Sequence, residues 1–160
     1  RSDYTYSAVV DSVTKRIQNE LPPTTPIHLI GYSMGGRVAL GIAEKGALPV
    51  SSLILESAHP GLQTNQEKKD RAIQEEKLAK ELEDQPLETF FSNWYDQPLF
   101  GLHFKPFKDT LLKSKINHKQ TSLSEVLKGY CTSQQPEVSH IWSTHWAIHT
   151  KESQTSGFCF

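Results

Sequence analysis

The chain has 160 residues, of which 36% are hydrophobic and 22% charged, and a formal net charge of −1. The length suffices for one domain with an apolar core, and the near-zero charge excludes the broad basic surface that nucleic acid or an anionic membrane would need. No run of about 18 apolar residues predicts a membrane-spanning helix. Cys131 and Cys159 form no Cys-x-x-Cys pair, which indicates a reducing compartment, so we expect a cytoplasmic protein.

The first third of the chain predicts an alternation of helices and strands. Apolar residues at every fourth position predict an amphipathic helix over 4–20. Short apolar runs predict buried strands over 27–31 and 51–57, with a helix over 35–45 between them. A strand, a helix and a second strand in this order form the crossover unit of a parallel sheet, so the predicted fold class is α/β.

The segment between the first strand and the following helix, Gly31-Tyr32-Ser33-Met34-Gly35, fits the pattern G-x-S-x-G. In a nucleophile elbow this pattern places a serine on a sharp strand-to-helix turn. We therefore predict that Ser33 is a catalytic serine and that the Met34 N–H is half of an oxyanion hole. Gly31 and Gly35 are expected to allow the close approach of neighbouring backbone. The alternative is a turn serine that caps the helix.

Residues 63–136 predict a series of helices that would form a lid beside the sheet. A charge-rich segment over 64–84 predicts an exposed helix, and prolines at Pro86 and Pro106 are typical of the starts of two more. The pair Ser122-x-x-Glu125 fits a capping box and predicts the start of a fourth helix.

Residues 137–160 are interpreted as an atypical tail for which disorder is one interpretation, and in it only Trp146-Ala147-Ile148 indicates a strand. The tail carries His140, His145 and His149, a set that raises the question of a metal site. No cluster of carboxylates or cysteines accompanies these histidines, so neither a metal nor any other cofactor is predicted.

Three segments at their particular separations resemble one enzyme family. They are Gly31–Arg37 (GYSMGGR), Glu56–Leu62 (ESAHPGL) and Asn93–Phe100 (NWYDQPLF). Together they are similar to the 2-succinyl-6-hydroxy-2,4-cyclohexadiene-1-carboxylate synthases, α/β-hydrolase-fold enzymes of menaquinone biosynthesis. The similarity extends over residues 1–136. It implies a partial α/β-hydrolase fold with the elbow over 1–62, followed by the helical lid.

This resemblance implies a carbon–oxygen lyase. The family eliminates pyruvate from 2-succinyl-5-enolpyruvyl-6-hydroxy-3-cyclohexene-1-carboxylate, a small polyanionic carboxylate, and a Ser–His–Asp triad acts in proton abstraction. By resemblance Ser33 is the triad serine and the Met34 N–H an oxyanion donor. Lys115 falls where the family more usually has arginine. The implied substrate contacts are Arg37, Arg71, Trp94 and Lys115.

Position along the helices and charge also bear on the predicted substrate contacts, independently of the resemblance. Arg37 is one helical turn after Ser33 and would share its face, and a substrate with several carboxylates needs cations. The alternative for Arg37 is a solvated helix charge. Arg71 has an acidic residue, Glu75, four positions later and could instead pair with it. Trp94 belongs to an aromatic stripe that could equally be lid packing.

The chain departs from the family pattern in its catalytic triad. The resemblance places the triad acid near residue 157, where Gly157 stands, and the triad histidine beyond Phe160. The family loop that gives the second oxyanion N–H would precede Arg1. We therefore expect a piece of a longer protein with little activity by itself. Two other hypotheses stay open, a serine esterase or thioesterase of the same fold and a non-catalytic fragment.

Overall fold

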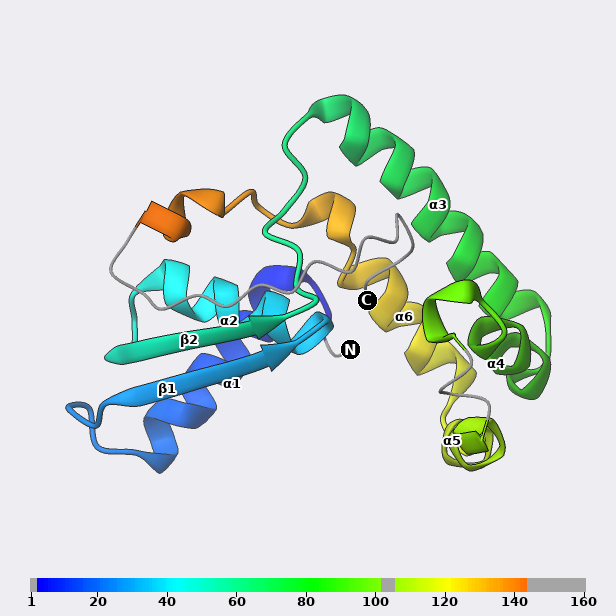
Figure 1. Ribbon diagram of the computed structural model, residues 1–160, viewed down its shortest axis with the longest axis horizontal. Helices are drawn as coiled ribbons and strands as arrows, with labels where there is room; N and C mark the ends of the chain where they lie inside the picture. The colour runs from blue at the N-terminus through cyan, green and yellow to red at the C-terminus, as the bar shows by residue number, and fades with distance from the viewer. Residues whose placement is uncertain (1–2, 102–105, 144–160) are drawn as a thin grey trace.

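The computed structural model describes residues 3–101 and 106–143 (Figure 1). In chain order its longer elements are α1 (Tyr6–Glu20), β1 (Ile27–Tyr32), α2 (Met34–Lys45), β2 (Val50–Glu56), α3 (Asn65–Asp84), α4 (Leu87–Tyr95), α5 (Lys108–Lys115) and α6 (Gln120–Gly129). Short 3₁₀ helices follow α4 and α6: η1 (Pro98–Phe100), η3 (Thr132–Gln134) and η4 (Ser139–Ser143).

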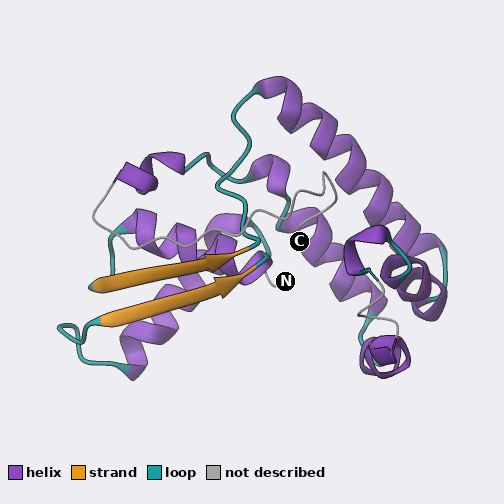
Figure 2. Cartoon of the chain, in the orientation of Figure 1, coloured by secondary structure: helices purple, strands orange, loops and turns teal. Residues whose placement is uncertain are grey.

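The two strands lie side by side and parallel, which confirms the predicted crossover unit (Figure 2). Leu29 pairs with Leu53 and Gly31 with Leu55, so both strands end at the same edge of the sheet. Because the carboxyl ends of parallel strands gather the turns that follow them, this edge positions the elbow.

Helices α1 and α2 cover one face of this sheet (Figure 1). Leu40 of α2 packs with Leu53 and Leu55 of β2 in one apolar cluster, and Val10 of α1 packs with Ile42 of α2 in a second. The opposite face stays open to solvent in the described structure, where Ile30 is 78% exposed. This alternation follows from the two-residue period of a strand, which sends neighbouring side chains to opposite faces.

The first residues of the predicted tail belong to the core of the sheet. Val138 and Ile141 are 1% and 4% exposed and pack with Leu53 and Leu55. The Val138 N–H donates to the Pro60 carbonyl at 2.8 Å, which ties this segment to the loop after β2. The sequence interpretation that placed residues from 137 onward in a separate tail is therefore corrected for residues 137–141. The predicted strand at 146–148 lies outside the described residues.

The lid helices form an apolar cluster of their own, built on Leu78, Leu82 and Phe90. Helix α3 starts with a capping box in which the Thr64 hydroxyl and the Glu67 carboxylate each receive a backbone N–H of the other residue. The capping box predicted at Ser122-x-x-Glu125 is wrong, because α6 begins at Gln120 and its N-cap is Lys119, three residues before Ser122.

Candidate active site

Ser33 occupies the turn that joins β1 to α2. Its φ of 48° and ψ of −118° lie outside the regions that non-glycine residues usually adopt, so the backbone is strained there. The Ser33 N–H donates to the Glu56 carbonyl at the end of β2, 2.9 Å away, and this bond holds the turn against the sheet. The strand, the strained serine and the following helix together form the context that a nucleophile elbow requires.

Two glycines of the elbow are required by close packing, and they are Gly31 and Gly36. A Cβ at Gly31 would lie 2.4 Å from the Gly36 Cα, and a Cβ at Gly36 would lie 2.5 Å from the Ala58 Cβ. A Cβ at Gly35 would meet nothing within 4 Å. The expectation that Gly31 and Gly35 share this role is thus corrected, since the backbone approaches Gly36 and leaves the solvent side of Gly35 open.

Ser33 and Met34 lie where helix α2 begins. Within α2, which the structure describes throughout, the Ser33 side chain makes no capping hydrogen bond, so the simple alternative of a capping serine is not supported. Met34 is the first helical residue, and the backbone N–H groups of a first helical turn lack partners inside the helix. These donors and the helix dipole favour negative charge beside Ser33.

Arg37 is buried, with 1% of its surface exposed. Its Nε donates to the Gln135 Oε1 at 2.5 Å and its Nη2 to the Tyr130 carbonyl at 3.2 Å. The guanidinium also lies 4.5 Å from the centre of the Tyr130 ring. The alternative of a solvated helix charge is therefore wrong. The predicted contact between Arg37 and a substrate remains a prediction, because here its guanidinium is bound to protein atoms.

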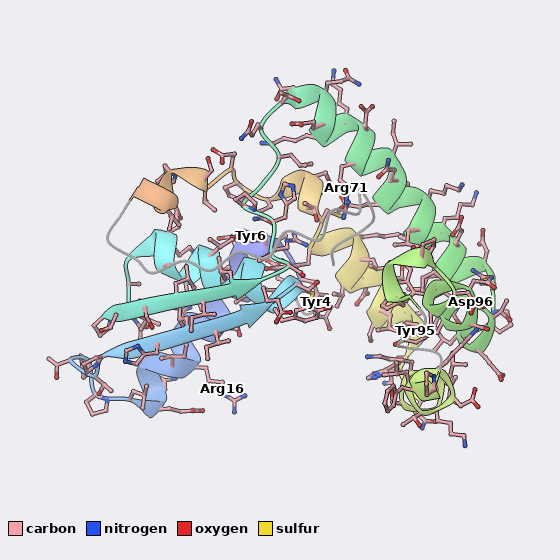
Figure 3. All side chains as sticks on the ribbon, viewed as in Figure 1. Tyr4, Tyr6, Arg16, Arg71, Tyr95 and Asp96 are labelled. Atoms are coloured by element: carbon pink, nitrogen blue, oxygen red, sulfur yellow. The ribbon has the colours of Figure 1, made fainter. Side chains whose placement is uncertain are left out.

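Arg71 projects from α3 toward the chain segment that follows α6 (Figure 3). Its Nε donates to the Glu75 Oε1 at 3.0 Å, which is the pairing considered from the sequence. Its Nη2 reaches the Thr132 Oγ1 at 3.4 Å. The side chain keeps 18% exposure, so it is partly accessible to solvent.

Trp94 and Lys115, the other two predicted substrate contacts, lie on different helices of the lid. Trp94 of α4 stacks on Phe90 with ring centres 6.3 Å apart and meets the Phe100 ring edge-on at 6.0 Å. Lys115 is the last residue of α5. Figure 3 shows Tyr95, the neighbour of Trp94, well separated from Arg71. The structure thus brings Arg37 and Arg71 to one chain segment, residues 130–135, while Trp94 and Lys115 lie on helices α4 and α5.

Sequence reasoning missed Gln135, which joins several parts of this region. Gln135 is fully buried, and besides accepting from Arg37 it donates from Nε2 to the His59 carbonyl at 2.8 Å. The Nδ1 of His59 accepts the Gly61 N–H at 3.0 Å, so this side chain stabilises the turn that follows β2. Burial, helped by the nearby charges of Arg71 and Arg37, lowers the pKa of His59 and so disfavours its charged form.

No group of three or more histidine, cysteine or acidic side chains in the described ranges is arranged to hold a metal ion. His145 and His149 lie outside those ranges. Among the helices that the structure describes, none is both long and apolar enough to cross a membrane.

Comparison with known proteins places this elbow in a protein class. The sequence matches the α/β hydrolase fold family over residues 1–159, and the chain belongs to that family. Two curated relatives carry the name 2-succinyl-6-hydroxy-2,4-cyclohexadiene-1-carboxylate synthase. The one from Enterobacter sp. (strain 638) is 32% identical over 117 residues, which cover 73% of this chain and 45% of the relative. The one from Salmonella heidelberg (strain SL476) is 32% identical over 110 residues, which cover 69% of this chain and 44% of the relative.

A solved structure of MenH from S. aureus is similar in fold, with a TM-score of 0.75 and 28% sequence identity over 86% of this chain and 51% of that one. The chain thus spans about half the length of the relatives it matches. The positions at which the resemblance expects the triad acid and the triad histidine, near 157 and beyond 160, lie outside the described residues.

Proposed function

We propose that the gene product this chain represents is a carbon–oxygen lyase that makes 2-succinyl-6-hydroxy-2,4-cyclohexadiene-1-carboxylate in menaquinone biosynthesis. The observation that carries the proposal is the strained Ser33 between β1 and α2, in a sequence that resembles relatives of that name. The proposed substrate is the polyanionic 2-succinyl-5-enolpyruvyl-6-hydroxy-3-cyclohexene-1-carboxylate, and the proposed location is the cytoplasm.

The reaction is a 1,4-elimination. A base removes the proton from ring carbon 2, which is acidic because the succinyl carbonyl is attached there. The electron pair forms the 2,3 double bond, the ring double bond moves to carbons 4 and 5, and the carbon–oxygen bond at carbon 5 breaks. The departing enolpyruvate takes up a proton at its methylene carbon and becomes pyruvate.

Each proposed residue has a task in this sequence. Ser33 would take part in the proton transfer, together with a histidine outside the described residues. Negative charge develops on the succinyl carbonyl oxygen, and the Met34 N–H at the start of α2 would donate to it. Arg71, and Arg37 if it becomes accessible, would bind carboxylates of the substrate, since guanidinium–carboxylate pairs are strong and directional. Lys115 would supply a point charge without that geometry.

A serine esterase or thioesterase is the second candidate, since Ser33 stands on the same kind of elbow. An esterase would accumulate an acyl-enzyme, so a fluorophosphonate probe should label Ser33.

The test is a pyruvate-release assay of the full gene product with the cyclohexene substrate, beside its Ser33→Ala variant. Ser57→Ala is the matched control, since Ser57 also has a positive φ, of 52°, at the end of a strand. We expect release that depends on Ser33 and not on Ser57. Labelling by fluorophosphonate without pyruvate release would favour the esterase. No release from the full gene product would overturn the proposal.

A further inference from the structure

Glu75 is a buried carboxylate in the middle of the long lid helix α3, and its side chain is 8% exposed. Its Oε1 accepts the Thr132 N–H at 2.7 Å and the Arg71 Nε at 3.0 Å. Its Oε2 accepts the Ser133 N–H at 3.2 Å and the Ser133 hydroxyl at 2.7 Å. Both oxygens therefore bind donors from a segment 57 and 58 positions further along the chain.

This carboxylate has a firm attachment that does not depend on Arg71. Three of its four hydrogen bonds come from Thr132 and Ser133, two of them from backbone N–H groups whose positions the chain fixes. A buried carboxylate with several donors stays ionised, since hydrogen bonds to the charged form offset its loss of hydration. Glu75 is thus a fixed negative charge at the junction of α3 and η3.

Arg71, by contrast, is held by the groups around Glu75. Its Nε contacts the Glu75 Oε1, and its Nη2 lies 3.4 Å from the Thr132 Oγ1. The charge-assisted bond to Glu75 is the stronger of these two contacts and restricts the rotamers of a long side chain. The orientation of the guanidinium therefore depends on Glu75.

The same segment, residues 132–135, also holds the second guanidinium. Gln135 accepts from the Arg37 Nε and anchors itself on the His59 carbonyl. Arg71 reaches this segment at Thr132 from the lid, and Arg37 reaches it at Gln135 from the elbow helix. The attachment of Glu75 to residues 132 and 133 therefore fixes the position of the Arg71 guanidinium relative to that of Arg37.

We propose that Glu75 is a positioning residue, which holds the partly exposed Arg71 side chain on the lid so that its guanidinium can bind a carboxylate of the substrate. This inference rests on the proposed function for its substrate, while the positioning of Arg71 stands on contacts of the chain itself. Glu75 is buried and its oxygens are occupied by protein donors, so it acts through Arg71.

The first test follows the arginine side chains by nuclear magnetic resonance. The chain has four arginines, so ¹⁵N-labelled arginine gives few Nε–H signals, which single arginine-to-lysine variants assign. We expect hydrogen exchange at the Arg71 Nε to be slow in the native chain. In Glu75→Gln it should approach that of Arg16, whose side chain is 80% exposed. The Arg37 signal should stay protected, since Gln135 still binds it.

The matched control is Glu76→Gln, which removes the charge of the adjacent exposed glutamate and should leave both signals unchanged. An unchanged Arg71 signal in Glu75→Gln would overturn the proposal. Loss of protection at Arg37 as well would show a general loosening of the 132–135 segment, and that result also overturns it.

The second test titrates the cyclohexene substrate into the same variants. Glu75→Gln should weaken binding about fivefold to tenfold, which is the coupling expected for directly contacting groups. When Arg71 is already replaced by alanine, Glu75→Gln should weaken binding of the substrate by less than about a further twofold. Equal weakening in both backgrounds would mean that Glu75 does not act through Arg71. If the native chain does not bind this substrate, the proposed function fails for the chain, and the Arg71 signal alone decides the role of Glu75.

Discussion

Alanine substitutions at two adjacent glycines of the elbow should have different effects on stability. At Gly36 the added methyl carbon would lie 2.5 Å from the Ala58 Cβ, 3.1 Å from the Gly31 oxygen and 3.3 Å from the Gly31 carbonyl carbon. At Gly35 it would meet nothing within 4 Å. Gly36→Ala should destabilise the fold, and Gly35→Ala should leave it unchanged or make it more stable.

The difference between the two variants isolates the steric cost. Both glycines lie in the first turn of α2, so the gain from replacing glycine by alanine in a helix, at most about 1 kcal/mol, is similar for both and largely cancels. What remains is the cost of moving Ala58 away by about 1 Å while the backbone of Gly31 stays in place. Overpacking of this kind costs about 1–3 kcal/mol, so Gly36→Ala should be less stable than Gly35→Ala by that amount.

The assay is urea unfolding of both variants, followed by far-ultraviolet circular dichroism and tryptophan fluorescence. If the free energy of unfolding falls with urea concentration at the same slope for both variants, their unfolding midpoints can be compared directly. Equal free energies of unfolding, within about 0.5 kcal/mol, would refute the argument that Gly36 is required by close packing. A larger loss for Gly35→Ala would refute it as well.

Three further outcomes follow from other features. Ser33→Gly should be more stable than Ser33→Ala by about 1 kcal/mol in urea unfolding, because glycine adopts the observed φ of 48° without strain; the reverse order would contradict a strained elbow. We expect chains to associate through the open face of the sheet, where Ile30 is 78% exposed, so Ile30→Lys should reduce association measured by light scattering; an equal degree of association in both proteins would contradict this. Burial opposes the ionisation of Glu75, but hydrogen bonds led by the one from Ser133 outweigh it and lower the pKa of Glu75. Its contribution to stability is therefore complete above the ordinary carboxyl pKa of 4.5 and is lost as the pH falls through the folded-state value, so Glu75→Gln should flatten the acid decline in stability and Glu76→Gln should not.

The crossover unit and the elbow could be predicted because their signals are local. A strand of six residues, a glycine pattern and a helix closed by Gly46 follow one another directly in the sequence, and each signal specifies its own backbone conformation. The family resemblance extended this reading to the fold class. Local signals could not predict that close packing requires Gly36 and not Gly35, because this depends on Ala58, which follows the next strand.

The start of α6 was missed for a related reason. Ser122-x-x-Glu125 has the residue types of a capping box, but the helix starts earlier, where the Gln120 side chain donates to the Leu82 and Gln85 carbonyls at 2.5 and 2.8 Å. Those carbonyls belong to the end of α3, where the last carbonyls of a helix have no partner within it. The start of α6 thus depends on a contact with the end of α3, whereas the local sequence predicted a start further along the chain.

The contacts between Glu75 and the 132–135 segment had no sequence signal at all. Glu75 was visible only as a neighbour of Arg71 at helical spacing, and Gln135 only as the place where the family similarity ends. Their roles depend on partners 57 to 98 positions apart, which meet because the segment after α6 returns to both α3 and α2.

The junction between α3 and η3 is polar, whereas the lid cluster of Leu78, Leu82 and Phe90 and the clusters beside the sheet are apolar. Separating α3 from η3 would break hydrogen bonds while exposing little apolar surface. Heat-capacity change and urea dependence both scale with newly exposed surface. Opening at this junction therefore has a thermodynamic signature of its own: it depends weakly on temperature and on denaturant, while unfolding of the apolar clusters depends strongly on both.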